Sequence, residues 1–354
     1  MRAVRAALLV GGVMLLGHSP SGAQSLGLDL QATTLIQAGG IRLLGMGGLS
    51  ASLPDGANIR NPAAMVYTMP REKEGLIGEF VRRKPERKDS YTALYGFVDR
   101  DTGAVQRLYS LTATRLEPER AALGVRYLRL RSNRYPFVLP GPQNVERQDE
   151  ADLLLFSYGQ EVLPRTALGI TLVRGTNHVR FFVPGGPPSA RLDIETEIGA
   201  DLSLYHQTKR GIRLGALFSH RNTEEDFRNF LGPSPPANRF GIRFYRLGAS
   251  YDPWRSLTLA VEYGGLRLED KRARRFTYDV RWYYGGEYRF PRGLALRVGS
   301  FGNQFAAGLG YRTPTGWQVD YAYVNDVNRK SAESIVGQPM PGSDTHFLSL
   351  QWLY

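Results

Sequence analysis

The chain has 354 residues, no cysteine, and 45 basic against 33 acidic side chains, which give a formal net charge of +12. The lack of cysteine excludes a disulfide framework and a thiolate metal site. Glycine, tyrosine and phenylalanine are abundant, at 40, 19 and 16 residues, which favours a protein with tightly turned strands and aromatic strand ends.

The first 23 residues are typical of a secretory leader. Arg2 and Arg5 form the charged start, residues 6–16 the apolar centre, and residues 21–23 a small-residue cleavage site. Roughly eleven apolar residues are too few to span a bilayer as a helix, which takes about 20. We therefore expect residues 1–23 to be a cleaved signal peptide rather than a retained anchor. In an exported chain, the positive charge predicts an anionic surface as partner and no nucleic acid.

Residues 39–65 do not follow the pattern of the rest of the chain. Five glycines occur within the first ten of these residues, and a Pro-Asp-Gly turn and an Asn-Pro pair follow. Glycine allows close approach of two backbones. We expect residues 24–70 to form a compact plug inside the lumen of the barrel predicted below. A flexible leader in front of the barrel is the alternative.

From about residue 105 onward, apolar and polar residues alternate over segments of roughly 9–11 residues, the length of a tilted membrane strand. Residues 257–264, LTLAVEYG, are an example, with apolar odd positions and Glu262 among the even ones. A soluble β-sandwich also alternates, but here the polar faces repeatedly carry full charges. We therefore predict a transmembrane barrel whose lumen-facing charges hold the plug. A polar translocation path along these charges is the alternative. These charges are Asp201, Arg213, Glu262, Asp279, Arg281, Glu287, Arg297 and Asp320.

Short turns and long connections also alternate, as in outer-membrane barrels, whose short turns are periplasmic. Thirteen segments of strand length lie between Val105 and the end of the chain. An even-numbered barrel of 14 strands needs one more, either residues 75–83 or residues 90–99. A 16-stranded barrel would need both, together with a strand near residues 41–53. We favour an all-β antiparallel barrel of about 14 strands over residues 71–354.

The long connections contain apolar residues that we expect to face outward. Large exposed apolar groups mark binding surfaces, so Phe137, Phe181, Phe182 and Phe230 are candidates for collecting a hydrophobic solute. Alternatively, these loops fold over one another and cap the barrel. A basic run at residues 271–275 falls on the external rim, where it either pairs with lipopolysaccharide phosphates or forms a solvated loop.

The last ten residues, THFLSLQWLY, form the clearest strand. Leu348, Leu350, Trp352 and Tyr354 share one face, and polar residues occupy most of the other. This ending resembles the signal by which outer-membrane barrels are inserted.

The chain does not support an enzymatic site. A serine hydrolase needs its serine and histidine on one surface, whereas Ser219 with His220, and Ser203 with His206, point to opposite faces of their strands. We expect no enzyme activity, no catalytic residues, no metal and no cofactor.

Two regions resemble a known family. Arg42, Leu44, Gly45, Met46, Gly47 and Gly48, then Asp55, then Asn61, Pro62 and Ala63 resemble the signature of the long-chain fatty acid transporter (FadL) superfamily. Residues 294–323 and the closing residues are similar to its PorV-like branch. The chain departs from the signature at Pro54 and lacks a second acid after Asp55.

The resemblance implies a 14-stranded barrel with the amino-terminal segment in its lumen. In FadL-type members this plug is a hatch that governs uptake of hydrophobic molecules, and the motif residues are Gly45, Met46, Gly47, Gly48, Asp55, Asn61 and Pro62. We therefore expect an outer-membrane barrel of a Gram-negative-type bacterium that takes up hydrophobic or amphipathic small molecules. A PorV-like accessory barrel for exported proteins, or a structural outer-membrane protein, is the alternative.

Overall fold

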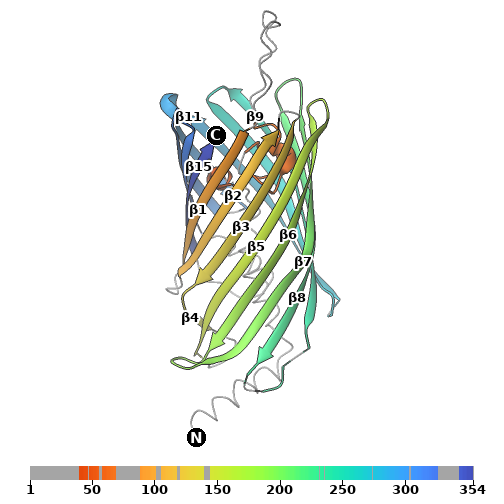
Figure 1. Cartoon of the computed structure of the whole chain (residues 1–354), viewed down its shortest axis with the longest axis vertical. Helices are drawn as coiled ribbons and strands as arrows, with labels where there is room; N and C mark the ends of the chain where they lie inside the picture. Colours follow the sequence, from red (N-terminus) through yellow and green to blue (C-terminus); the bar gives the residue numbers. More distant parts are fainter. Residues whose placement is uncertain are drawn as a thin grey trace, which may run out of the picture.

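The computed structural model describes residues 40–46, 48–55, 58–68, 88–100, 105–117, 120–138, 144–230, 232–234, 236–272, 274–302, 304–325 and 343–353. The expected signal peptide, the strand candidate at residues 75–83 and Gly47 lie outside these ranges. Over the described residues, the chain forms one closed antiparallel β-barrel (Figure 1). No helix in this part of the chain is long and apolar enough to cross a membrane.

The wall consists of β1 (Lys88–Arg100), β2 (Val105–Glu117), β3 (Ala121–Ser132), β4 (Tyr135–Val138), β5 (Asn144–Leu163), β6 (Thr166–Phe182), β7 (Pro188–Gln207), β8 (Arg213–Asn229), β9 (Asn238–Trp254), β10 (Leu257–Asp270), β11 (Arg275–Arg289), β12 (Leu294–Phe301), β13 (Gln304–Arg312), β14 (Trp317–Val324) and β15 (Ser343–Leu353). A short 3₁₀ turn, η1 (Pro291–Gly293), joins β11 to β12.

The ring has fourteen strand positions. β3 pairs with residues 150–160 of β5, and β4 pairs with residues 144–147 of the same strand, so β3 and β4 together fill one position. β1 pairs with β15 along its length and joins the two ends of the chain. The prediction of 14 strands is confirmed, and the first strand is the candidate at residues 90–99. The residues near 41–53 begin with a helix and add no strand to the wall.

Alternation places the polar face of each strand inside the ring. In β10, Thr258, Ala260 and Glu262 are buried inside, whereas Leu259 and Val261 are 48% and 42% exposed on the outside. In β15, Leu350 and Trp352 point outward in the same way. Because these apolar side chains form a continuous outer band, the exterior suits lipid rather than water.

The two ends of the barrel differ. The tight turns after β2, β5, β7, β9, β11 and β13 lie at the end where β15 finishes, which we call the short-turn end (upper in Figure 1). Gly211 and Gly316 have φ angles of +84° and +91° there, a conformation that glycine adopts readily. At the opposite end, the long-strand end, β5 to β8 extend furthest.

Two of the long connections expected from the sequence, residues 180–190 and 222–238, consist in large part of strand. β6 continues to Phe182 and β7 begins at Pro188, and β8 continues to Asn229. In these extensions the outward side chains are charged, and inward side chains such as Val179, Leu192 and Ile194 are apolar. Arg191 and Asp193, 2.6 Å apart, and the Arg129–Glu150 pair lie on the outer surface. Water solvates such pairs, so the strands continue beyond the apolar band.

Candidate functional site

The described residues between Gly40 and Thr68, which we call the inner segment, lie inside the barrel (Figure 1). Helix α3 (Ile41–Gly45) packs against β12 to β15, and helix α4 (Pro62–Met65) packs against β3, β5, β6 and β7. The segment therefore crosses the lumen from one wall to the other. Its apolar side chains, among them Leu43, Met46 and Leu49, are fully buried.

Glu262 of β10 is the main attachment point of the inner segment. Its carboxylate accepts hydrogen bonds from the backbone N–H groups of Ser50, Ala51 and Ser52, at 2.7 to 3.0 Å. Successive N–H groups turned toward one anion form a nest. Arg246 lies 3.5 Å from the same carboxylate and donates to the hydroxyl of Ser50 and the carbonyl of Gly48. The guanidinium carbon of Arg246 is 3.9 Å from the ring centroid of Tyr283.

A second attachment point is Glu287 of β11. Arg42 of α3 donates to its two carboxylate oxygens from Nε at 2.8 Å and from Nη2 at 3.0 Å. Arg297 donates to Glu287 at 2.7 Å and to Asp320 at 2.6 Å, which links three wall strands to α3. Burial alone would lower the pKa of Arg42, but the Glu287 carboxylate outweighs this effect and the pKa is raised. Arg42 therefore stays charged and paired.

The third contact contains more positive than negative charge. Arg60 is buried, and its Nη2 lies 2.8 Å from Asp201 of β7. Arg221 of β8 also donates to the Asp201 carboxylate, so two guanidinium groups share one acid. Nε and Nη1 of Arg60 have no hydrogen-bond partner in the described part of the chain. Burial lowers the pKa of Arg60 to about 9 although Asp201 opposes the shift, and Arg221, Arg246 and Arg126 lower it further.

Asn61 holds the two halves of the inner segment together. Its side-chain oxygen accepts from the N–H of Ala64 at 3.0 Å and caps α4, and Pro62 fits the first helical position. Its side-chain nitrogen donates to the carbonyls of Ser50, at 3.2 Å, and Ala51, at 2.6 Å. The Asn-Pro pair of the motif thus fixes the turn whose N–H groups bind Glu262.

Replacing Asn61 by aspartate is expected to loosen this turn. Aspartate keeps the capping oxygen but turns a second oxygen toward the two carbonyls, and a lost buried hydrogen bond costs about 1–3 kcal/mol. Trypsin should then cut after Arg60 faster than in the unaltered protein. The same change at Asn222, on the outer face of β8, should leave the cleavage rate unchanged. Equal protection in both variants would contradict the bracing role of Asn61.

Glycines of the wall allow the inner segment to touch the strands. A Cβ at Gly215 would lie 1.8 Å from the carbonyl oxygen of Ala51, one at Gly285 2.1 Å from that of Met46, and one at Gly159 2.2 Å from that of Pro62. No side chain fits at these positions. The glycines of the segment were expected to allow close packing, but those of the wall were not; their signal in the sequence is a glycine at an inward strand position.

The described motif residues are spread along the inner segment, from α3 to α4. Gly45 abuts Gly308 of β13, with 3.0 Å between its Cβ position and the Gly308 Cα. Gly48 has a φ of +75° and lies against the ring of Phe301. Asp55 is buried, and its carboxylate is 3.9 Å from Arg42. Met46 packs within the buried apolar core. Pro62 packs against the wall.

The predicted lumen charges divide into two groups. Asp201, Glu262 and Glu287 contact the inner segment directly, and Asp320 is linked to it through Arg297. Arg213 pairs instead with Asp252 near the short-turn end, at 2.6 Å, and Asp279 pairs with Arg281 at 2.9 Å. Arg60, Arg221 and Arg246 belong to the site but were missed, because an isolated arginine in a sequence does not reveal its burial.

Three of the four predicted loop phenylalanines lie in strands. Phe137 belongs to β4, and Phe181 and Phe182 end β6. Phe181 packs near Phe227, with ring centroids 6.4 Å apart, and Phe182 is only 2% exposed beneath the guanidinium of Arg134. Phe230, just after β8, is 56% exposed. Phe182 is therefore not an exposed collection residue, whereas Phe230 stays a candidate.

Near the long-strand end, part of the inner wall is apolar, beside buried polar groups such as Arg147, Asp149 and Glu225. One cluster joins Val179 to Leu192 and Ile194, and another joins Phe240 to Ile242 and Leu268. Along β9, Phe240, Ile242 and Phe244 form an inward row. The Phe244 ring centroid is 6.0 Å from the guanidinium carbon of Arg60 and 5.3 Å from that of Arg246. This row therefore leads from the long-strand end to the buried arginines.

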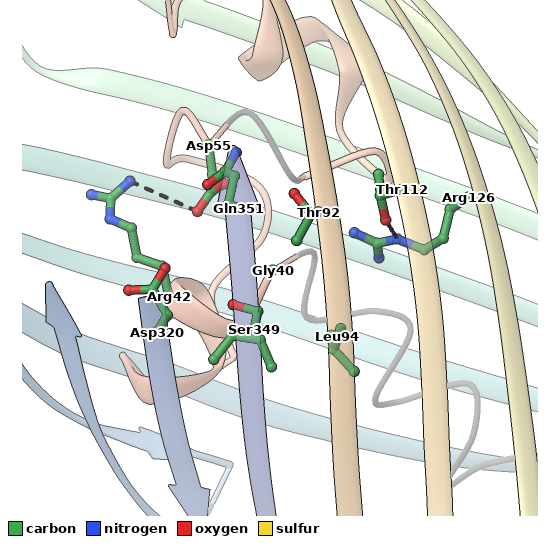
Figure 2. Close-up of a pocket in the computed structure, with 11 residues that line it drawn as sticks. Gly40, Arg42, Asp55, Thr92, Leu94, Thr112, Arg126, Asp320, Ser349 and Gln351 are labelled. Carbon is green, nitrogen blue, oxygen red and sulfur yellow. Dashed lines mark hydrogen bonds and ion pairs between the residues drawn. The ribbon is translucent and has the colours of Figure 1, made fainter. Parts of the chain in front are cut away.

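A small polar gap separates the inner segment from the wall beside β1, β2, β3, β14 and β15 (Figure 2). Arg42, Asp55, Arg126 and Asp320 line it with several hydroxyl groups, and Arg126 donates to Thr112 at 2.8 Å. Its volume of about 10 Å³ is room for about one water molecule.

The histidine and serine pairs are divided between the two faces. Ser203 and Ser219 are buried inside the barrel, and His220 is on the outside. His206 contacts the hydroxyl of Thr166 at 2.9 Å. These pairs do not form a serine–histidine dyad.

Comparison with known proteins identifies the fold. No protein-family model matches the chain, and no curated protein matches its sequence. The toluene transporter TbuX of Ralstonia pickettii aligns with a TM-score of 0.55 and 13% identity, over 87% of this chain and 96% of that chain. The toluene transporter TodX of Pseudomonas putida aligns at 0.53 and 10%, over 87% and 95%. A FadL homologue of Pseudomonas aeruginosa aligns at 0.50 and 14%, over 87% and 96%. The chain therefore has the fold of these FadL-like barrels.

Proposed function

We propose that this protein is an outer-membrane channel for the uptake of hydrophobic or amphipathic small molecules. In this proposal residues 1–23 are a cleaved signal peptide, residues 24–70 are a hatch, and residues 71–354 are the barrel. The observation that supports it is the apolar part of the lumen lining at the long-strand end, which leads to the inner segment. A water-filled pore has a polar interior, whereas here Phe240, Ile242 and Phe244 point inward.

The fold supports the same function. TbuX and TodX are toluene transporters, and this chain shares their architecture. The short turns support an orientation with the long-strand end outside the cell. A ligand would enter at that end, follow the apolar row of β9 and reach the inner segment.

The buried arginines extend the range of ligands to amphipathic molecules. Among the residues that the structure describes, N–H groups of Arg60 find no partner, and Asp201 balances only one of the two arginines beside it. A buried, unpaired donor is costly. A ligand with an anionic or hydrogen-bond-accepting end would satisfy these groups while its apolar part contacts Phe244. Release would then require the contacts at Glu262, Glu287 and Asp201 to loosen.

Uptake by reconstituted protein tests this proposal. Proteoliposomes should accumulate a radiolabelled fatty acid or toluene, and Ile242→Asn should lower the initial rate about tenfold, the effect of about 1.4 kcal/mol. Ile212→Asn, on the outside near the short-turn end, is the matched control and should leave the rate unchanged. If neither the whole protein nor a variant lacking residues 40–68 passes any hydrophobic solute, the transport function is wrong. The accessory barrel for exported proteins stays a prediction.

A further inference from the structure

The outer surface of β8 to β11 carries a row of aromatic rings near the long-strand end. Tyr263 lies 5.0 Å from Trp282 and 6.2 Å from Tyr245, measured between ring centroids. Tyr278 lies 6.5 Å from Tyr245. Tyr245 also covers the outer face of Gly265, where a Cβ would meet its ring at 2.5 Å. Such amphipathic rings are typical of the boundary between the apolar core of a membrane and its head groups.

The spacing along β9 agrees with this boundary. Trp254 and Tyr245 mark the two ends of its outward apolar stretch. The nine residue-to-residue steps from Tyr245 to Trp254 span about 30 Å at about 3.3 Å each. At a strand tilt of about 40° this length covers about 23 Å of membrane thickness, close to the height of a barrel's apolar band. The next outward residue, Arg243, therefore lies at the level of the lipid head groups.

Basic side chains gather directly beyond the aromatic row. Arg243 of β9 is directly opposite Arg267 of β10, and His220 of β8 is opposite Arg243 on its other side. Lys271 extends over the outer face of Gly241, two residues from Arg243, with its Cε 3.7 Å from the glycine's Cβ position. Its ammonium group donates to Asn222 at 2.8 Å.

This cluster has fewer acids than bases. Like charges directly opposite on neighbouring strands destabilise a sheet. The nearest acid to Arg267 is Glu269, 3.8 Å away, and its guanidinium lies over the ring of Phe276 at 4.7 Å. Within the described ranges, Arg243 makes no ion pair. A dianionic group between the two guanidinium groups would remove the repulsion and accept forked hydrogen bonds from both.

We propose that Arg243, Arg267 and Lys271 bind a phosphate of an outer-leaflet glycolipid, of the lipopolysaccharide type. The site is at head-group depth, and the rings of Tyr245 and Tyr263 below it provide a flat surface for the sugar or the first acyl carbons. The basic run at residues 271–275 contributes Lys271, whereas the two strand arginines form the centre. This inference concerns the outer wall and does not depend on the uptake function.

Binding of defined lipids tests the site. Purified protein in nonionic detergent is titrated with bis-phosphorylated lipid A, with the dephosphorylated form of the same lipid, and with phosphatidylglycerol, and bound lipid is counted by native mass spectrometry. The variant carrying Arg243→Glu and Arg267→Glu should bind bis-phosphorylated lipid A at least about tenfold more weakly. Arg255→Glu, in the short turn between the same two strands, should bind it normally. Dephosphorylated lipid should bind every protein equally weakly.

Two results would overturn the proposal. The first is unchanged affinity of the double variant for bis-phosphorylated lipid A. The second is an equal loss for phosphatidylglycerol, which would show attraction to any anion. If the double glutamate variant does not fold, as judged by heat-modifiable electrophoresis, the double glutamine variant is used with the same criteria. Solute uptake, measured on the same proteins, should stay unchanged.

Discussion

Replacing Glu262 with alanine is expected to release the inner segment from the wall while the fourteen strand positions stay paired. The N–H groups of Ser50, Ala51 and Ser52 would lose their acceptor, and Arg246 would lose its buried counter-charge. Removing one partner of a buried ion pair costs about 3–5 kcal/mol. Nearly all of this free energy is lost from the binding of the inner segment to the barrel wall, and little from the pairing of the strands. Trypsin should cut after Arg42 and Arg60, and planar bilayers should show larger and more frequent conductance steps.

Glu269→Ala is the matched control for this experiment. Glu269 is on the same strand but faces outward, where it lies 3.8 Å from the half-exposed Arg267. An exposed pair of this kind contributes little to stability. In the control, trypsin should therefore not cut after Arg42 or Arg60, and the planar bilayer should show no additional conductance steps. If Glu262→Ala gave the same result as the control, Glu262 would not be what holds the segment.

The example of Glu262 shows how far the sequence leads. Alternation along residues 257–264 predicts that this carboxylate points into the lumen, and the structure confirms it. Its partners are backbone N–H groups some 210 residues away, and every residue has such a group. No residue type therefore marks the nest in advance. The strand count and the faces of the strands were predictable because lipid imposes one rule on all of them.

The long-strand end was harder to predict for a related reason. Beyond the apolar band, the solvent outside the wall is water, so charged residues such as Arg191 and Asp193 face outward. Val179 and Ile194 then face inward, and the polarity of the alternation reverses within one strand. A reading that assumes one polarity interprets the reversal as a loop. The phenylalanines of β6 were misplaced in this way.

Arg60 and Arg246 were missed because the burial of a side chain depends on the whole fold and not on the local sequence. Arg60 directly precedes the Asn-Pro pair of the motif, and Arg246 follows the inward row of phenylalanines on β9. The neighbours of each arginine can be identified from the sequence, by the motif for Arg60 and by strand alternation for Arg246. Their burial becomes visible only when the segment and the wall are placed together, and this placement also gives the surplus of positive charge on which the amphipathic ligand depends.

A methyl group at Gly215 is expected to unseat the inner segment as effectively as the loss of Glu262. The Cβ of Gly215→Ala would lie 1.8 Å from the carbonyl oxygen of Ala51. Ala51 has little freedom to move, because its N–H binds Glu262 at 2.7 Å and its carbonyl accepts from Asn61 at 2.6 Å. The strand itself tolerates the change, since alanine makes the same ladder hydrogen bonds as glycine and costs less backbone entropy. The steric clash therefore destabilises the packing of the inner segment against β8, by about 1–3 kcal/mol or more.

Heat-modifiable electrophoresis should show a folded Gly215→Ala barrel, and trypsin should cut it after Arg42 and Arg60. Gly241→Ala in β9 is the control, because its nearest atoms would be at an ordinary 3.7 Å. Its segment should stay protected. Because Gly215→Ala leaves every charge in place, release in this variant and in Glu262→Ala would show that a backbone-to-backbone contact and an anion nest hold the same turn. Protection of Gly215→Ala equal to that of Gly241→Ala would contradict the close seating of the inner segment on β8.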